Sequence, residues 1–254
     1  MDELEGVGRT DDNEGQHRTD HDHFFLQHQQ IVKGKTGAYR SQRFIGRGGN
    51  GTTFLATAID GPYSGVQFAL KVFHKVSNRQ RRSAFLREVE YYKTLKHPSI
   101  VGFYDEGEYR VGDRVYPFVL IEYAPRSLQR VMVEQARRIE RAAALRIVLS
   151  VTSALRYLHS LPLIHRDIKP GNILISGETA RLADFGLAKS LEEATADEPK
   201  AVKDELAYAA MPKFYRTPEL IRRARGDSTA LTPASDIYQL VPAHRDYDSL
   251  TGSG

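Results

Sequence analysis

The sequence predicts an α+β fold in which a β-rich first part with one helix precedes a mostly helical second part. Short runs of β-branched and aromatic residues, separated by Gly, Pro and Asp, predict strands between residues 38 and 121. Residues 78–96 interrupt them with the helical spacing of Phe85, Val89 and Tyr92. After residue 126 the pattern becomes helical, most clearly at 140–160, so the two parts differ in class.

Composition limits the kind of protein further. The 254 residues are 41% hydrophobic and 27% charged, as in one soluble domain or a two-lobed one. No apolar run approaches the roughly 20 residues of a membrane span, and no signal segment opens the chain. The absence of cysteine excludes disulfides and thiolate catalysis. We therefore expect a cytoplasmic or nuclear protein that is not secreted.

Charge is distributed unevenly along the chain. Residues 1–37 carry eight acidic and four basic side chains and lack sustained periodicity, so they are expected to form a disordered tail. The rest of the chain then carries a net charge of +8, within a total of +4. A basic body suits phosphates or acidic peptides, although solvated Lys and Arg side chains are the simpler explanation.

A glycine-rich segment, IGRGGNGTTF, lies between two predicted strands. Gly46, Gly48 and Gly51 form G-x-G-x-x-G, where the missing Cβ atoms let backbone N–H groups approach a phosphate. A dinucleotide-binding fingerprint would continue into a helix, whereas this segment continues into the strand TTFLATA. A strand–loop–strand lid over phosphates is favoured, with a simple glycine-rich hairpin as the alternative.

Lys71 stands within an apolar predicted strand, FALKVF. It either points to solvent from an edge strand or is held inside a cleft, and a cleft would require a partner. Glu88, on the helical face beside Phe85 and Tyr92, is the candidate. A Lys–Glu pair would fix the ammonium group for a phosphate.

Charged residues crowd the segment LIHRDIKPGNILISG, residues 163–177, beside an aliphatic strand. Asp167 can accept a hydroxyl proton, Lys169 can neutralise a migrating phosphoryl group, and Asn172 can coordinate a divalent cation. Asp184 in LADFGLA follows another strand, where its carboxylate is a hard oxygen ligand suited to Mg²⁺.

In this order and spacing the segments resemble the protein kinase family, including its glycine-rich loop, H-R-D-x-K-x-x-N and D-F-G motifs. FYRTPEL at 214–220 and SDIYQL at 235–240 extend the resemblance, which covers about residues 40–241. It implies a bilobal kinase domain at 38–241. The N-lobe would span about 38–121, the hinge 122–126 and a partial, mostly α C-lobe 127–241.

The resemblance also implies ATP and Mg²⁺ as cofactors and roles for further residues. Ala69 and Leu174 would enclose the adenine, and backbone groups from Glu122 to Ala124 would bond it. Lys71, Glu88, Asp167 and Lys169 would be catalytic, and Asn172 and Asp184 would bind the metal. A stacked column linking the lobes would contain Tyr92, Phe103, His165 and Phe185. Asp236 would bond the backbone around His165 and Arg166.

Some positions depart from the family pattern. Thr53 stands where Val usually covers adenine, and Pro212 replaces a Ser or Thr of the substrate-docking loop. After SDIYQL the chain reads VPAHRDYDSLTGSG, and Pro242 is expected to end the helix after at most about two turns. Residues 242–254 would then be an aberrant or disordered tail of an incomplete C-lobe, leaving Leu155 and Leu158 partly exposed.

Two functions remain in competition. The first is ATP-dependent phosphoryl transfer from Mg-ATP to Ser or Thr hydroxyls of protein substrates, which the residues of HRDIKPGN favour. The second is a non-catalytic, truncated kinase remnant that binds nucleotide or a partner. Neither hypothesis includes a nucleic-acid partner or a membrane segment, and the sequence does not predict an oligomeric state.

Overall fold

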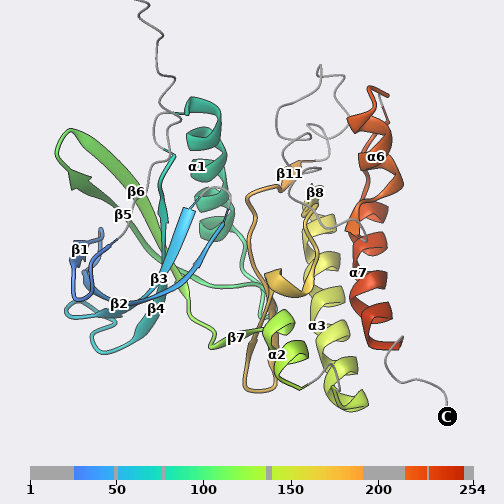
Figure 1. Cartoon of the computed structure of the whole chain (residues 1–254), viewed down its shortest axis with the longest axis horizontal. Helices are drawn as coiled ribbons and strands as arrows, with labels where there is room; N and C mark the ends of the chain where they lie inside the picture. The colour runs from blue at the N-terminus through green and yellow to red at the C-terminus, as the bar shows by residue number, and fades with distance from the viewer. Residues whose placement is uncertain are drawn as a thin grey trace, which may run out of the picture.

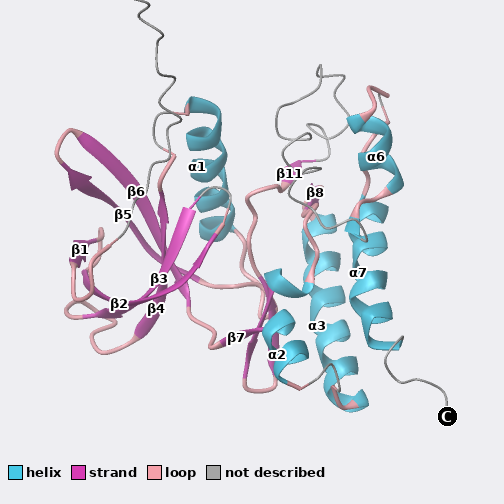
Figure 2. Ribbon diagram, in the orientation of Figure 1, coloured by secondary structure: helices cyan, strands magenta, loops and turns pink. Residues whose placement is uncertain are grey.

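The computed structural model describes residues 26–48, 51–75, 78–135, 139–190, 215–227 and 229–248. Figure 1 shows these residues as two lobes, and Figure 2 shows that most strands gather in the first and most helices in the second. The α+β class predicted from the change in periodicity is confirmed. No helix of the described residues has the length and apolar character needed to cross a membrane.

The N-lobe is built on one antiparallel sheet of six strands in the order β1-β2-β3-β4-β6-β5. The bounds of its strands are β1 Ile31–Lys33, β2 Ala38–Arg47, β3 Gly51–Ala58, β4 Gln67–Phe73, β5 Phe103–Val111 and β6 Arg114–Glu122. Alternate side chains on β3, β4 and β6 are buried with an aromatic core that includes Phe54 and Phe118. These strands supply the rigid support on which Lys71 is held.

Helix α1, Arg79–Thr94, crosses between β4 and β5. It begins at Asn78, whose side chain accepts a hydrogen bond from the backbone N–H of Arg81, a typical helix N-cap. Its apolar stripe, Phe85, Val89 and Tyr92, is buried. The predicted helix and its buried face are therefore confirmed.

The expectation that residues 1–37 form a disordered tail is wrong for residues 26–37. β1 pairs with β2, Leu26 is buried, and Gly34 forms a β-bridge with Gly107 on β5, so this segment joins the two edges of the sheet. The buried carboxylate of Asp105 holds the turn after β1 by accepting hydrogen bonds from the backbone N–H groups of Lys35 and Thr36. Residues 1–25 lie outside the described residues.

The C-lobe begins after a short connection at residues 123–125. It contains β7 Arg126–Ser127, α2 Leu128–Glu134, α3 Arg141–Ser160, β8 Leu163–Ile164, a 3₁₀ turn Pro170–Asn172, β9 Ile173–Ser176, β10 Thr179–Leu182, β11 Lys189–Ser190, α6 Pro218–Ala224 and α7 Pro233–Asp248. β7, β9 and β10 form a small antiparallel sheet, and β8 pairs with β11. The charged motifs lie in the loops that connect these two small sheets, between β8 and β9 and between β10 and β11.

The larger hydrophobic core is continuous between the lobes. It includes Tyr92 of α1, Phe185 beyond β10 and Leu155 of α3. The expectation that Leu155 and Leu158 are partly exposed is wrong, because both side chains are buried against this core. Leu145 and Leu149, on another side of α3, are exposed instead.

Helix α7 extends through Pro242 to Asp248, so the expectations that the helix ends before this proline and that residues 242–248 form a disordered tail are wrong. A proline inside a helix removes one hydrogen bond, here to the carbonyl of Tyr238 four residues earlier. Tyr238 is 45% exposed, so water can reach this side of the helix and replace the lost donor. Residues 249–254 lie outside the described residues.

Candidate active site

Lys71 lies in the centre of the sheet, on β4, and its ammonium group points to the α1 carboxylate of Glu88. Lys71 Nζ lies 2.5 Å from Glu88 Oε1 and 3.2 Å from Asp184 Oδ1. Burial alone would lower the pKa of Lys71, but the charges of Asp184 and Glu88 outweigh it and raise this pKa well above its usual value. Lys71 is therefore a permanent cation, and the solvent-facing alternative is excluded.

Asp184 lies two residues after the end of β10, with its backbone in the left-handed region at φ 65°. A residue other than glycine is strained there and needs support from its surroundings. Its N–H donates to the hydroxyl of Tyr92, 3.1 Å away, and its carboxylate faces Lys71. The charge of Lys71 holds the pKa of Asp184 below its usual range, so the carboxylate is ionised at neutral pH.

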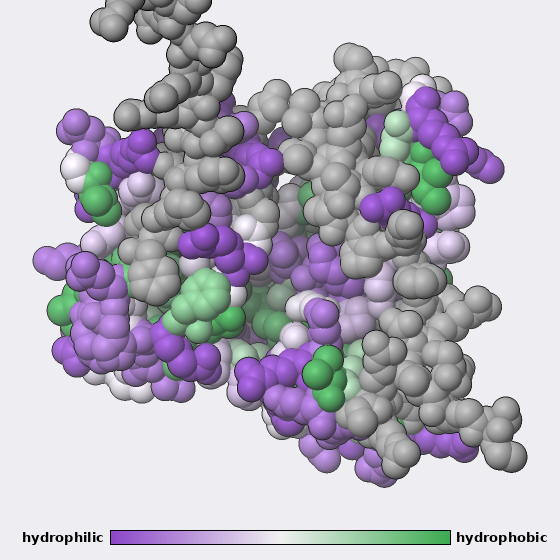
Figure 3. Space-filling model, viewed as in Figure 1, coloured by the Kyte–Doolittle hydropathy of each residue, from purple (hydrophilic) through white to green (hydrophobic). Residues whose placement is uncertain are grey.

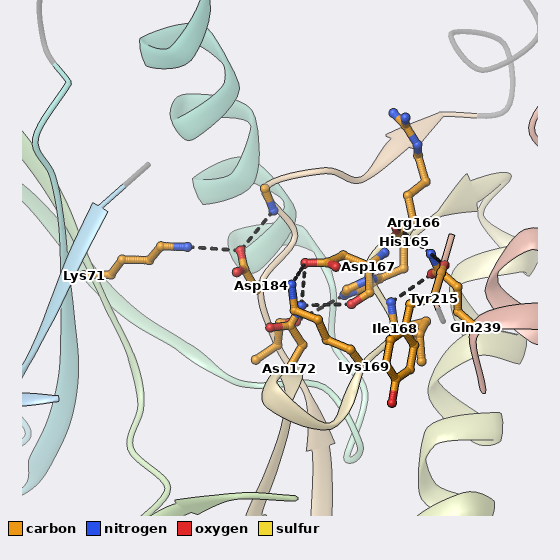
Figure 4. A network of polar contacts seen from close by, with 12 residues as sticks. Lys71, His165, Arg166, Asp167, Ile168, Lys169, Asn172, Asp184, Tyr215 and Gln239 are labelled. Carbon is orange, nitrogen blue, oxygen red and sulfur yellow. Dashed lines mark hydrogen bonds and ion pairs between the residues drawn. The ribbon is translucent and has the colours of Figure 1, made fainter. Parts of the chain in front are cut away.

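Asp167, Lys169 and Asn172 meet in the loop between β8 and β9 (Figure 4). Lys169 Nζ and Asn172 Nδ2 each lie 2.8 Å from Asp167 Oδ2, and Asn172 Nδ2 also donates to the Asp167 carbonyl. Because these bonds use the amide nitrogen, the side-chain oxygen of Asn172 is left to ligate or accept. Among the described residues, both side-chain partners of Asp167 contact Oδ2, which leaves Oδ1 to receive a hydroxyl.

The base of this loop is held by α7. The buried carboxylate of Asp236 accepts hydrogen bonds from the backbone N–H groups of His165, at 3.0 Å, and Arg166, at 2.7 Å. Three residues later, the buried amide of Gln239 bonds the backbone at Arg166 and Ile168 (Figure 4). The implied role of Asp236 agrees with this geometry, whereas sequence reasoning missed Gln239.

The predicted interlobe column is formed in large part. The Phe185 ring contacts the rings of Tyr92, with centroids 5.4 Å apart, and His165, with centroids 5.0 Å apart. Phe103 packs against the same core. Burial lowers the pKa of His165, so the neutral ring accepts from the Asp167 N–H at Nδ1 and donates from Nε2 to the Ala183 carbonyl.

The three glycines of the loop between β2 and β3 differ in their surroundings. A Cβ atom on Gly51 would lie 2.7 Å from the carbonyl oxygen of Val72, so the packing of β3 on β4 requires glycine there. A Cβ on Gly46 would meet no atom within 4 Å, and one on Gly48 only the Gly51 carbonyl at 3.9 Å. Packing within the described chain therefore explains Gly51 but leaves open space at Gly46 and Gly48.

Glu122 ends β6 at the junction of the lobes. Its N–H donates to the Gly102 carbonyl and its carboxylate forms an ion pair with Arg181, so its carbonyl, not its N–H, is left for a ligand. Among the described residues Ala124 has no backbone hydrogen bond. Ala69 and Leu174 belong to the hydrophobic core that is continuous between the lobes. Figure 3 shows apolar surface in the hollow between the two lobes.

The structure thus brings the charged residues predicted from the motifs into one site, and it adds three contributions that the sequence did not reveal. These are the hydroxyl of Tyr92, which was predicted only as part of an apolar column, the side chain of Arg181, and Gln239. Pro212 lies outside the described residues. No group of three or more His, Asp or Glu side chains able to hold a metal occurs among the described residues.

The six-stranded lobe contributes a Lys–Glu pair and the helical lobe contributes the Asp167 loop. Together they define a phosphotransferase-like site. Comparison with known proteins identifies the family. The family model "Protein kinase domain" matches residues 39–241. The chain belongs to the protein kinase domain family.

Relatives from bacteria and plants share this similarity. Over 169 residues, 66% of this chain and 25% of the relative, the chain is 34% identical to serine/threonine-protein kinase PknB of Mycobacterium leprae. It is 35% identical over 191 residues to L-type lectin-domain containing receptor kinase V.5 of Arabidopsis thaliana, covering 72% of this chain and 27% of the relative. CBL-interacting protein kinase 4 of Oryza sativa subsp. japonica is 29% identical over 221 residues, 84% of this chain and 46% of that protein. The chain therefore matches about a quarter to a half of the length of these relatives.

Proposed function

We propose that this chain is a protein kinase domain that transfers the terminal phosphoryl group of Mg-ATP to Ser or Thr hydroxyls of protein substrates. The observation that carries the proposal is the meeting of Lys71, Glu88 and Asp184 within hydrogen-bond distance, next to a loop in which Asp167 and Lys169 are paired. A cation, an ionised metal ligand and a proton acceptor are the three groups that phosphoryl transfer requires.

The residues present fit both ATP and Mg²⁺. The open space at Gly46 and Gly48 is available to phosphates, and Lys71 is a permanent cation beside it. Mg²⁺ is usually held by one or two protein side chains together with substrate phosphates, which agrees with Asp184 and Asn172 as the candidate ligands. When bound, the metal would neutralise charge on the phosphates.

The acceptor hydroxyl would be oriented by Asp167. Its Oδ1 atom would accept the hydroxyl hydrogen, while Lys169 and Asn172 hold Oδ2. Lys169 would also neutralise charge on the group being transferred, because its ammonium lies beside the acceptor position. Lys71, fixed by Glu88, would hold the phosphates in line with that hydroxyl.

The non-catalytic alternative was favoured by the incomplete C-lobe that the end of the sequence predicts. α7 instead presents Asp236 and Gln239 to the loop backbone, which supports the catalytic hypothesis. A preference for Ser and Thr is supported by Lys169 in the HRDIKPGN motif and by the name of the Mycobacterium leprae relative, a serine/threonine-protein kinase.

Isothermal titration with a non-hydrolysable ATP analogue, with and without Mg²⁺, tests the first half of the proposal. We expect metal-dependent binding that Lys71→Met and Asp184→Asn both weaken. ADP release with three peptides identical except for Ser, Thr or Tyr at the acceptor position tests the second half. Turnover with Ser and Thr but not Tyr is expected, whereas nucleotide binding without any turnover would favour the non-catalytic alternative.

A further inference from the structure

Gln239 is a buried amide on α7, 1% exposed, and it makes three hydrogen bonds to other described segments of the chain. Its Oε1 atom accepts from the N–H of Ile168 at 2.9 Å. Its Nε2 atom donates to the carbonyls of Arg166, at 3.1 Å, and Tyr215, at 3.2 Å. The amide therefore uses both of its hydrogens and its oxygen at once.

No other common side chain of this size can make this set of contacts. Glutamate has the same shape but no hydrogen to donate when ionised, and Met and Leu have neither donor nor acceptor. Serine is too short to span from α7 to both segments. A buried, fully used amide of this kind fixes the relative position of the groups that it bonds.

The residue that Gln239 helps to hold is conformationally strained. Arg166, just before Asp167, has φ 70°. Such backbones persist where the surroundings determine them. Here Asp236 accepts a hydrogen bond from the N–H of Arg166 and Gln239 donates one to its carbonyl, so α7 holds both backbone polar groups of the residue. On the other side of Asp167, Gln239 also accepts a hydrogen bond from the N–H of Ile168.

We propose that Gln239 is a positioning residue for phosphoryl transfer, which rests on the function proposed above. By bonding the peptide groups on both sides of Asp167, it fixes the carboxylate relative to the bound phosphates. By bonding the carbonyl of Tyr215, it also ties the segment leading into α6, where the acceptor peptide is expected to dock, to the same loop. Gln239 thus sets the distance between the acceptor hydroxyl and Asp167.

The test compares Gln239→Met and Gln239→Glu with the parent and with Ser235→Ala. Methionine removes all three contacts, whereas glutamate keeps an acceptor for Ile168 but loses the donors. Ser235 is the matched control, because it is buried one turn earlier on α7 and its hydroxyl has no hydrogen-bond partner among the described residues. The full chain is used, and turnover is expressed per nucleotide-binding site, so that loss of folded protein is not mistaken for loss of catalysis.

We expect Gln239→Met to lower kcat by about tenfold to a hundredfold, the cost of a catalytic group displaced by about an ångström. The KM for the acceptor peptide should rise several-fold, while the KM for ATP should stay within about twofold, because the three hydrogen bonds described for Gln239 go to Arg166, Ile168 and Tyr215, which are not among the nucleotide-binding residues. Hydrogen exchange at the Ile168 amide should accelerate in Gln239→Met but not in Gln239→Glu. Ser235→Ala should match the parent in all four measurements.

A general loss of structure would change the KM for ATP and the peptide KM together, so it is distinguishable from lost positioning. A kcat per binding site equal to that of the parent in Gln239→Met would overturn the proposal. If the parent itself shows no turnover, the proposed function is overturned. Hydrogen exchange at the Ile168 amide then tests separately whether Gln239 holds the loop. Unchanged exchange at this amide in Gln239→Met would refute the structural role of Gln239 as well.

Discussion

Replacing Asp236 by Asn should destabilise the C-lobe, because the buried carboxylate serves three donors. Oδ1 accepts from the Arg166 N–H, and Oδ2 accepts from the His165 N–H and from His159 Nε2 at 2.9 Å. Asparagine keeps the shape but replaces one acceptor oxygen by an NH₂ group, which must face at least one of these donors. The loss of one bond to a charged group and the burial of an unpaired N–H should together cost about 3 kcal/mol.

Denaturant unfolding followed by fluorescence measures this loss, and Asp227→Asn is the matched control. Asp227 is exposed between α6 and α7 and makes no side-chain hydrogen bond among the described residues, so its variant should unfold within about 0.5 kcal/mol of the parent. If Asp236→Asn also lay within that range, α7 would not support the catalytic loop, and the reasoning from its buried contacts would be refuted.

Two further predictions concern Asp105 and Tyr92. Burial tends to raise the pKa of Asp105, but hydrogen bonds from Thr36 and Tyr39 outweigh this and lower it. The contribution of Asp105 to the free energy of unfolding should therefore be complete above the unfolded pKa of about 4 and be lost as pH falls through the lower folded pKa. When unfolding is measured at a series of pH values, the free energy of unfolding of Asp105→Asn should fall less steeply at acid pH than that of the parent. Equal pH dependence in the two proteins would contradict this. Tyr92→Phe keeps the ring on Phe185 but removes the acceptor for the Asp184 N–H, so the Mg²⁺ concentration for half-maximal turnover should rise several-fold. The control Tyr157→Phe loses an equivalent bond to the Lys96 amide at 3.2 Å and should leave this Mg²⁺ concentration unchanged. Equal effects of the two variants would count against a role of the Tyr92 hydroxyl at Asp184.

The charged part of the site could be predicted because its residue types are themselves unusual. A charged Lys71 inside an apolar strand and a charged Asp167 beside an aliphatic strand each need a partner or a function. The order of the motifs along the chain indicates which residues these partners are. The contact between Lys71 and Glu88 then follows from the helix periodicity, which places Glu88 next to the buried stripe.

The neutral contributions were missed because their role depends on where distant segments meet. Gln239 is one polar residue in a helix, and only the fold reveals that it faces the peptide groups around Asp167. β1 has three residues, too few to show alternation, and it is stabilised by the buried Asp105 some 70 positions later. Pro242 was interpreted from its usual effect on a helix, although one missing hydrogen bond is tolerable where water can replace it.

The central claim is that Asp167 acts in transfer rather than in nucleotide binding. The most direct test is rapid-quench single-turnover phosphoryl transfer to a Ser peptide by the parent and by Asp167→Asn, with the affinity for Mg-ATP measured on the same samples. We predict a loss of transfer of at least about a hundredfold in Asp167→Asn, with ATP affinity within about twofold of the parent. Equal transfer rates, or a parallel loss of ATP affinity, would contradict the account.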